Sequence, residues 1–230
     1  MPVLSVLMPV YNEAATAKQA IEDVLATDVG MDLELIVVDD GSTDGTREIL
    51  QRAEWPDRVR LILHDENRGK GAAVRTALAA AQGEFSAIFD ADLEYDPGDL
   101  ATLLPPLARG DTNAVFGVRA FDGYTSHSFL YVIGNKAVTL VANLLFNVYL
   151  RDLMTCHKAI RTDVFKSLPL RGTGFEIEPE ICARLLQRGE RIFELPVRYK
   201  ARRSEEGKKL TAVDGLRVVA TLLRCGLSRG

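Results

Sequence analysis

LELIVVDDGSTDGTREIL, Leu33 to Leu50, is the stretch that decides the fold. Its apolar run LELIVVDD predicts a buried strand, and the turn rich in Gly, Ser and Asp leads into a helix around Thr43 to Arg52. The composition of Ser42 to Asp44 predicts a cap for that helix. A buried strand that passes through a short turn into a helix is typical of α/β proteins.

The same alternation continues on both sides of this stretch. We expect a strand LSVLMPV and a helix around Ala15 to Leu25 before it, and a strand VRLILHD, a helix from about Gly71 to Ala81 and a strand FSAIFDAD after it. Four apolar strands separated by helices imply a parallel sheet with right-handed crossovers and helices on both faces. Ligands of such sheets bind beyond the carboxyl ends of the strands. The residues expected at that edge are Tyr11, Asn12, Glu13, Asp39, Asp40, Arg68, Lys70, Asp90 and Asp92.

The second half of the chain is less regular. Strands are expected at AVFGVR, at HKAIR before a short helix, and at RIFELPVRYK. Helices are expected over Ser128 to Tyr149, over FEIEPEICARLLQRG as far as Gly189, and near Val213 to Leu223. The pattern therefore predicts a mostly parallel central sheet flanked by helices, in one domain over residues 1–230.

Composition excludes several classes of protein. With 230 residues, 47% hydrophobic and 26% charged, the chain can bury a core and is not a disordered or low-complexity protein. Its 28 basic and 32 acidic residues give a net charge of −4, which does not favour nucleic acid as a partner. Three cysteines without metal-ligand spacing fit a reducing cytoplasm. The first residues, MPVLSVLMPVYNE, predict a strand rather than a signal peptide, and Phe129 to Leu150 has too many polar interruptions for a membrane span.

The segment FDADLEYDPGDL carries five acids in ten residues, Asp90 to Asp99. Because alternate residues of a strand point to the same side, Asp90 and Asp92 at a strand end can face one point, with Glu94 close behind. Converging carboxylate oxygens suit Mg²⁺ or Mn²⁺, which binds through one or two carboxylates and substrate phosphates. The alternative is a strand-end acid followed by a helix cap, for which Asp96 before Pro97 is the better candidate.

Two further turns could contact a nucleotide. One carboxylate of VVDDGSTDGT can accept hydrogen bonds from a base or a ribose. In ENRGKGAAV, Gly69 and Gly71 open a helix beside Arg68 and Lys70, and a helix N-terminus with nearby cations can receive a diphosphate. The second turn has neither GxGxxG nor GK[ST], so it supports neither a dinucleotide-binding loop nor a P-loop. An ordinary turn and helix cap is the alternative for both.

Together, these segments resemble family 2 glycosyltransferases of the GT-A fold. PVYNE (Pro9 to Glu13), VVDDGSTDGT, NRGKGAAV and DADLEYDP match the nucleotide-sugar half of that family in order and spacing. Downstream, GVR, RDLMTCHKAIR, FEIEPEI and EGKK look like the dolichyl- or polyprenyl-phosphate glucose and mannose synthases. The resemblance implies a nucleotide-sugar-binding half over residues 1–100 and an acceptor-binding half over residues 101–230.

The resemblance also implies roles for single residues. The nucleotide sugar would be bound by Pro9, Tyr11, Glu13, Asp40, Lys70, Asp90 and Ala91, and the metal by Asp90, Asp92 and Glu94, the last at a position where relatives often carry Gln. Arg119 corresponds to an arginine that relatives use for the acceptor phosphate, and Asp152 looks like the acid near the transferred sugar. The catalytic set is thus Asp92, Arg119 and Asp152. Arg202, Lys208 and Lys209, in a basic tract, could close over the diphosphate.

The implied activity is inverting, metal-dependent transfer of a hexose from UDP-glucose or GDP-mannose to a polyprenyl or dolichyl phosphate. The acceptor would place the cytoplasmic chain at a membrane surface or on a membrane partner protein, with Phe129 to Leu150 and the last helix as the contact. Two alternatives stay open. One is transfer to a hydroxyl acceptor, with Asp152, Glu176 or Glu178 as the base; the other is a nucleotide-sugar binding module without catalysis.

Overall fold

The computed structural model describes residues 4–119, 129–200 and 212–227. In these ranges, one seven-stranded sheet has the order β3-β2-β1-β4-β6-β5-β7. Its strands are β1 (Leu4–Val10), β2 (Leu33–Asp39), β3 (Val59–Leu63), β4 (Phe85–Ile88), β5 (Ala114–Arg119), β6 (Lys158–Arg161) and β7 (Ile192–Val197). Only β6 runs antiparallel to its neighbours, β4 and β5. The sheet is therefore mostly parallel, as the sequence predicts.

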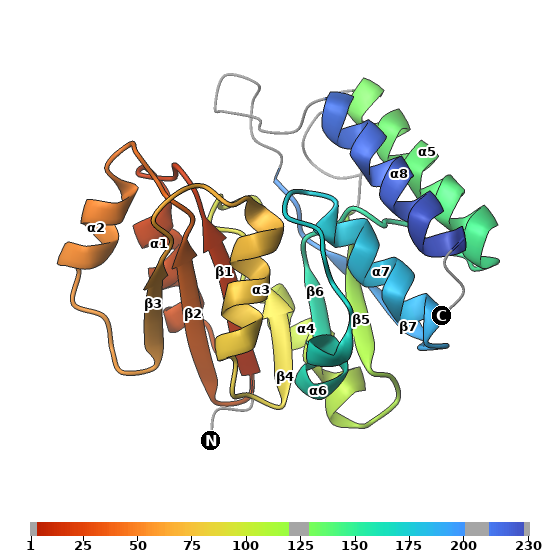
Figure 1. Cartoon of the computed structure of the whole chain (residues 1–230). Coiled ribbons are helices and arrows are strands. Elements are labelled where there is room, and N and C mark those ends of the chain that lie inside the picture. The colour runs from red at the N-terminus through yellow and green to blue at the C-terminus, as the bar shows by residue number, and fades with distance from the viewer. Residues whose placement is uncertain (1–3, 120–128, 201–211, 228–230) are drawn as a thin grey trace.

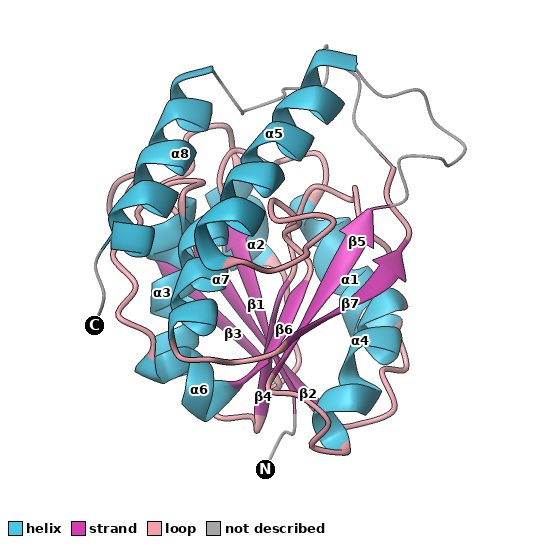
Figure 2. Ribbon diagram, turned by 90° about the vertical axis from the view of Figure 1, so that its right-hand side faces the viewer, coloured by secondary structure: helices cyan, strands magenta, loops and turns pink. Residues whose placement is uncertain are grey.

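Helices cover both faces of the sheet (Figures 1 and 2). On one face lie α1 (Ala17–Ala26), α2 (Thr46–Arg52) and α4 (Asp99–Ala108). On the other lie α3 (Lys70–Ala80), α6 (Thr162–Ser167) and α7 (Ile177–Gln187), with α5 (Phe129–Phe146) and α8 (Ala212–Leu227) side by side. The two layers follow from the period of two in the strands: Leu35 and Val37 face the first layer, and Ile36 and Val38 face the second.

Most predicted elements are present, with ends shifted by a few residues. Helix α2 begins at Thr46 rather than at Thr43, and its N-cap is Gly45 instead of a residue of Ser42 to Asp44. Ser42 and Asp44 accept the amides of Asn12 and Ala14 in the neighbouring loop. Apart from the cap considered at Asp96, no sequence pattern predicted α4, which contains Pro105 and Pro106 and has Gly98 as its N-cap. Two adjacent prolines inside a helix oppose its prediction, whereas here Leu100, Leu103 and Leu104 bury its apolar side against the sheet.

The strand order reverses between β1 and β4, and we call the carboxyl ends of these two strands the crevice, after the usual ligand site of such sheets. Pairing of these strands stops at Leu7 and Ile88, after which only the Phe89 amide reaches the Leu7 carbonyl, at 3.0 Å. Pro9 is two residues after Leu7, so its backbone nitrogen faces β4, where the pairing has already ended. The N–H that proline lacks therefore leaves no sheet hydrogen bond unmade. The carboxyl ends of strands at such a reversal are the usual ligand site of open α/β sheets.

In the part of the chain that the structure describes, no helix is long and apolar enough to cross a membrane.

Candidate active site

The loops that follow β1 and β2 are tied together at the edge of the crevice. The Asn12 amide donates to Ser42 Oγ and the Glu13 amide donates to Thr46 Oγ1, both at 2.9 Å. The side-chain oxygen of Asn12, a residue at φ +51°, accepts a hydrogen bond from the Thr43 amide. These reciprocal bonds fix Tyr11 and Glu13, both half-buried, at the rim where the sequence predicts a nucleoside.

Asp40 holds the loop that leads into α3. Its carboxylate accepts hydrogen bonds from the amides of Arg68 and Gly69, at 3.0 and 2.7 Å, and lies 2.7 Å from His64 Nδ1. Gly69 has φ +90°, and a Cβ there would overlap the Thr173 carbonyl, so only glycine fits. Asp40 thus has a structural role in this arrangement, and its assignment to the nucleoside stays a prediction.

The acid run Asp90 to Asp96 follows β4 directly and forms a tight turn. Asp90, Asp92 and Glu94 are partly exposed at the crevice, and Ala91 between them is buried. Leu93 has φ +59°, a conformation that costs a non-glycine residue energy and that concentrates at functional sites. Asp92 Oδ1 accepts the Glu94 amide at 3.1 Å, which stabilises the turn.

Lys70 forms an ion pair with Asp90, the first acid of this run. Its Nζ lies 2.7 Å from Asp90 Oδ2, 3.2 Å from Glu178 Oε1 and 3.0 Å from Cys156 Sγ. Burial alone would raise the pKa of Asp90, but the attraction of Lys70 outweighs it and lowers that pKa. Burial also works against the charged form of Lys70, yet Asp90 and Glu178 keep its pKa well above the usual value. Both groups are therefore ionised at neutral pH.

The carboxylates fit a divalent ion that is shared with a ligand. Within the described ranges, no group of three or more His, Cys, Asp or Glu side chains is placed to hold a metal by itself. Glu94 Oε2 accepts the Tyr199 hydroxyl at 2.8 Å. Asp90 and Asp92 would thus be the protein's hard oxygen donors, and Mg²⁺ commonly takes one or two carboxylates and completes its shell with phosphate oxygens.

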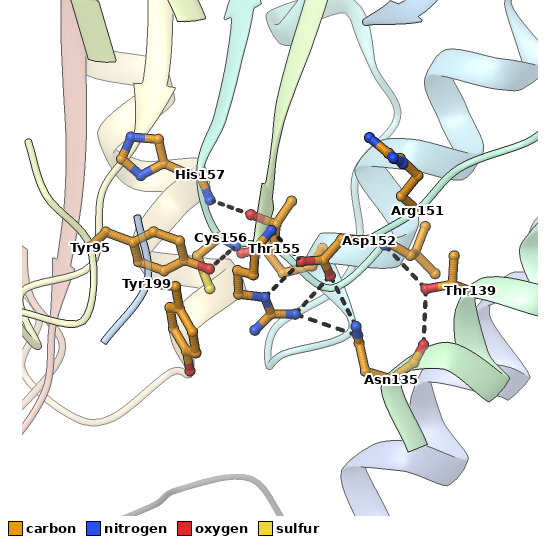
Figure 3. Close-up of polar contacts among 12 residues, drawn as sticks. Tyr95, Asn135, Thr139, Arg151, Asp152, Thr155, Cys156, His157 and Tyr199 are labelled. Carbon is orange, nitrogen blue, oxygen red and sulfur yellow. Dashed lines mark hydrogen bonds and ion pairs between the residues drawn. The ribbon is translucent and has the colours of Figure 1, made fainter. Parts of the chain in front are cut away.

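Arg119 and Asp152 form a buried pair beside the crevice. Arg119 Nε and Nη2 donate to the two carboxylate oxygens of Asp152, each at 2.7 Å, and the Arg119 amide adds a third bond at 3.1 Å. Asn135 donates to the same carboxylate at 3.1 Å, and Thr139 lies one turn further along α5 (Figure 3). Burial would raise the pKa of Asp152, but these bonds outweigh burial and lower it. Asp152 is therefore an anion in a fixed position, and it orients the guanidinium of Arg119.

Tyr199 connects this pair to the acid run. Its ring lies 5.2 Å from the guanidinium of Arg119 while its hydroxyl donates to Glu94. Its ring also packs against Tyr95, whose hydroxyl accepts the Cys156 amide at 3.3 Å (Figure 3). Through these contacts Glu94, a predicted metal ligand, is linked to Arg119, a predicted acceptor-side residue.

The structure thus brings together the candidates at the ends of β1, β4 and β5. Arg202, Lys208 and Lys209 lie outside the described residues. Sequence reasoning missed Asn135, Lys158 and Tyr199, because each is defined by a partner far away in the chain. Glu176, at the N-terminal end of α7, accepts the amides of Thr173 and Gly174, at 2.9 and 3.0 Å, which ties its carboxylate to the preceding loop.

Curated proteins are similar to this chain in sequence. "Glycosyltransferase AglJ" of Haloferax volcanii is 30% identical over 199 residues, which cover 86% of this chain and 63% of that protein. "Dodecaprenyl-phosphate galacturonate synthase" of Rhizobium johnstonii is 29% identical over 207 residues, 86% of this chain and 59% of that protein. The chain therefore spans under two thirds of the length of either relative.

Solved structures support the fold. Glucosyl-3-phosphoglycerate synthase from Mycobacterium tuberculosis, in complex with uridine diphosphate, superposes with a TM-score of 0.74 at 24% identity, covering 98% of this chain and 80% of that one. The same enzyme with Mn²⁺, uridine diphosphate and phosphoglyceric acid gives a TM-score of 0.72 at 23% identity, covering 98% and 79%. The GT-A fold expected from the sequence is confirmed. Because the model of "Glycosyl transferase family 2" also matches residues 5–168, the chain belongs to that family.

Proposed function

We propose that the chain is a metal-dependent, inverting glycosyltransferase that moves a hexose from a nucleotide sugar, UDP-glucose or GDP-mannose, to a polyprenyl phosphate. The observation that carries the proposal is the single site described above. Pro9 and Tyr11 lie at the end of β1, Asp90 and Asp92 follow the neighbouring strand β4, and Tyr199 links the buried Arg119 to the same acid run.

On the donor side, the chain's own groups favour departure of a nucleoside diphosphate. The leaving group accumulates negative charge, and preorganised cations stabilise that charge without reorganisation. Lys70 is such a cation, held at the N-terminus of α3, where helix amides also favour an anion. A divalent ion held by Asp90 and Asp92 would supply further charge neutralisation to the diphosphate. The same proposal includes Glu94 as a third metal ligand. It also includes closure over the diphosphate by Arg202, Lys208 and Lys209.

On the acceptor side, the arrangement favours a nucleophile that is already anionic. A phosphate needs positioning rather than deprotonation, and Arg119 is held rigidly for that purpose by Asp152. A hydroxyl would need a carboxylate base within hydrogen-bond reach. The candidates Asp152, Glu176 and Glu178 are each engaged by other groups, which disfavours the hydroxyl alternative.

A lipid acceptor also fits the outer side of α5 and α8. Exposed apolar side chains form what we call the apolar face: Phe129, Ile133, Leu140 and Leu144 of α5, and Leu216, Leu223 and Leu227 of α8. Helix α8 is therefore apolar on two opposite sides, since Val218, Leu222 and Cys225 are buried. The sequence of α5 contains no acid, and exposed Lys136 and Arg217 border the face. Apolar side chains with a basic border favour the surface of an anionic bilayer.

The acceptor class can be tested directly. The protein is incubated with each donor, labelled in the sugar, with polyprenyl phosphate and Mn²⁺, and the product is partitioned between water and organic solvent. We expect the label to enter the organic phase. Label that stays in a water-soluble glycoside would favour the hydroxyl alternative, and nucleotide binding without any transfer would favour a binding module.

A further inference from the structure

Lys70 Nζ lies between two carboxylates at the edge of the crevice. Asp90 Oδ2 is 2.7 Å away and Glu178 Oε1 is 3.2 Å away, and the Lys70 side chain is only 10% exposed. The Phe175 ring lies 5.9 Å from the same nitrogen. Lys70 therefore has two anionic partners within reach of one ammonium group, and a small movement can change which of them is the closer.

Glu178 is fixed from its other side. Its second oxygen, Oε2, lies 2.6 Å from Lys158 Nζ, and both side chains are essentially fully buried. Lys158 also donates to the carbonyls of Leu153 and Thr155, and its ammonium lies 4.9 Å from the Phe116 ring. Glu178 is thus a rigid carboxylate, whereas Asp90 is at the partly exposed end of a strand.

This arrangement creates a conflict when a divalent ion arrives at Asp90. Two cations would then meet at one carboxylate, and their repulsion is strong because the site is poorly hydrated. The ammonium of Lys70 can relieve the repulsion if it moves toward Glu178, where a fixed negative charge remains. Without Glu178, Lys70 would have to stay with Asp90 or lose its partner.

We propose that Lys70 is a resident counter-ion of Asp90 that changes partner to Glu178 when a divalent cation binds. Glu178 is then a positioning residue for metal binding although it is not a metal ligand. The inference rests on the proposed metal site at Asp90 and Asp92. It explains why Glu178, an acid of α7 that is not a predicted metal ligand, is buried between two lysines.

The proposal predicts effects of opposite sign for two neighbouring substitutions. Lys70→Met removes the competing cation and should strengthen the binding of Mn²⁺ alone about ten-fold, or about 1.4 kcal/mol. Glu178→Gln removes the second partner of Lys70 and should weaken Mn²⁺ binding by a similar factor. In the Lys70→Met background, Glu178→Gln should have almost no effect, because Glu178 acts only through Lys70.

Mn²⁺ binding to the full chain is measured by electron paramagnetic resonance of the free ion, first with Mn²⁺ alone and then with UDP present. Lys18→Met is the matched control: it removes an exposed cation of α1 that pairs with Glu22 and should change affinity little. Glu178→Gln leaves Lys158 without its carboxylate, so the double variant Glu178→Gln/Lys158→Met is measured as well, and near-ultraviolet circular dichroism checks that each variant is folded.

Two results would overturn the partner exchange. One is equal signs for Lys70→Met and Glu178→Gln; the other is an effect of Glu178→Gln that persists in the Lys70→Met background, since Glu178 would then act by its own charge. Asp92→Asn separates this from the proposed function. If the wild type binds Mn²⁺ no better than Asp92→Asn under either condition, the metal site itself is wrong and the exchange fails with it.

Discussion

Asp152 shows how a single residue orients Arg119, on the proposed acceptor side of the site. Arg119 is 4% exposed, so its charge depends on the carboxylate that it meets through three hydrogen bonds. Asp152→Asn would leave a buried guanidinium without an anion, and we expect a loss of about 3 to 5 kcal/mol in the free energy of unfolding, measured by urea denaturation. The matched control is Asp111→Asn, which breaks a 2.8 Å pair with Arg109 at the surface and should cost less than about 1 kcal/mol. Equal losses for the two variants would contradict the structural role of Asp152.

His157 makes the fold sensitive to acid. The ring is 1% exposed, it packs against Phe89 and Tyr95, and neither nitrogen has a hydrogen-bond partner among the described residues. Burial lowers its pKa from the usual 6.5 to about 4. Between pH 6.5 and 4 the unfolded chain therefore binds a proton at His157 that the folded chain does not bind. The stability present above pH 6.5 is lost as the pH falls toward 4.

The substitution His157→Phe should remove that part of the pH dependence. We expect wild type and variant to differ in the slope of unfolding free energy against pH between 6.5 and 4, by about 3 kcal/mol over the interval. Urea denaturation at several pH values measures the slope. Parallel slopes would mean that His157 titrates normally in the fold.

At the scale of elements, the start of α3 depends on glycine. Gly69→Ala would place a Cβ against the Thr173 carbonyl at φ +90°, and we expect a loss of about 3 kcal/mol in stability together with weaker nucleotide binding. Gly110→Ala is the control, because its φ of +74° is similar but no atom lies within 4 Å of the added Cβ. The control should lose only about 1 kcal/mol, again by urea denaturation.

The elements also show what a sequence can predict. Strands β1, β2 and β4 are evident because buried parallel strands are continuous apolar runs, and the acids after β4 fall at the ligand edge for the same reason. The partners of those acids could not be predicted, because Lys70 meets Glu178, and Tyr199 meets Glu94, only after the chain has folded. Helix propensity also fails to predict α4, because the burial of its leucines outweighs the effect of two prolines.

At the scale of the whole molecule, the apolar face of α5 and α8 predicts binding to lipid. The wild type should float with vesicles of phosphatidylglycerol and much less with phosphatidylcholine, because the border of the face is basic. The double variant Leu140→Glu/Leu144→Glu should lose that binding without a change in melting temperature. Phe193→Glu, at a 37% exposed position on β7, is the control and should still float. If the wild type does not bind vesicles but forms a dimer, and the double variant is monomeric, then the apolar face serves self-association.

The central claim for the whole molecule is that the carboxylates after β4 enable sugar transfer to a lipid phosphate. The most direct test compares wild type, Asp92→Asn and Asp96→Asn for transfer of labelled sugar into the organic phase, with Mn²⁺ and with chelator. Asp96 belongs to the same acid run but pairs with Arg198 at the surface, at 2.8 Å. We expect transfer by wild type and Asp96→Asn only when Mn²⁺ is present, and a loss of at least about a hundred-fold, roughly 2.7 kcal/mol, for Asp92→Asn. Unchanged transfer by Asp92→Asn, or full transfer in chelator, would contradict the account.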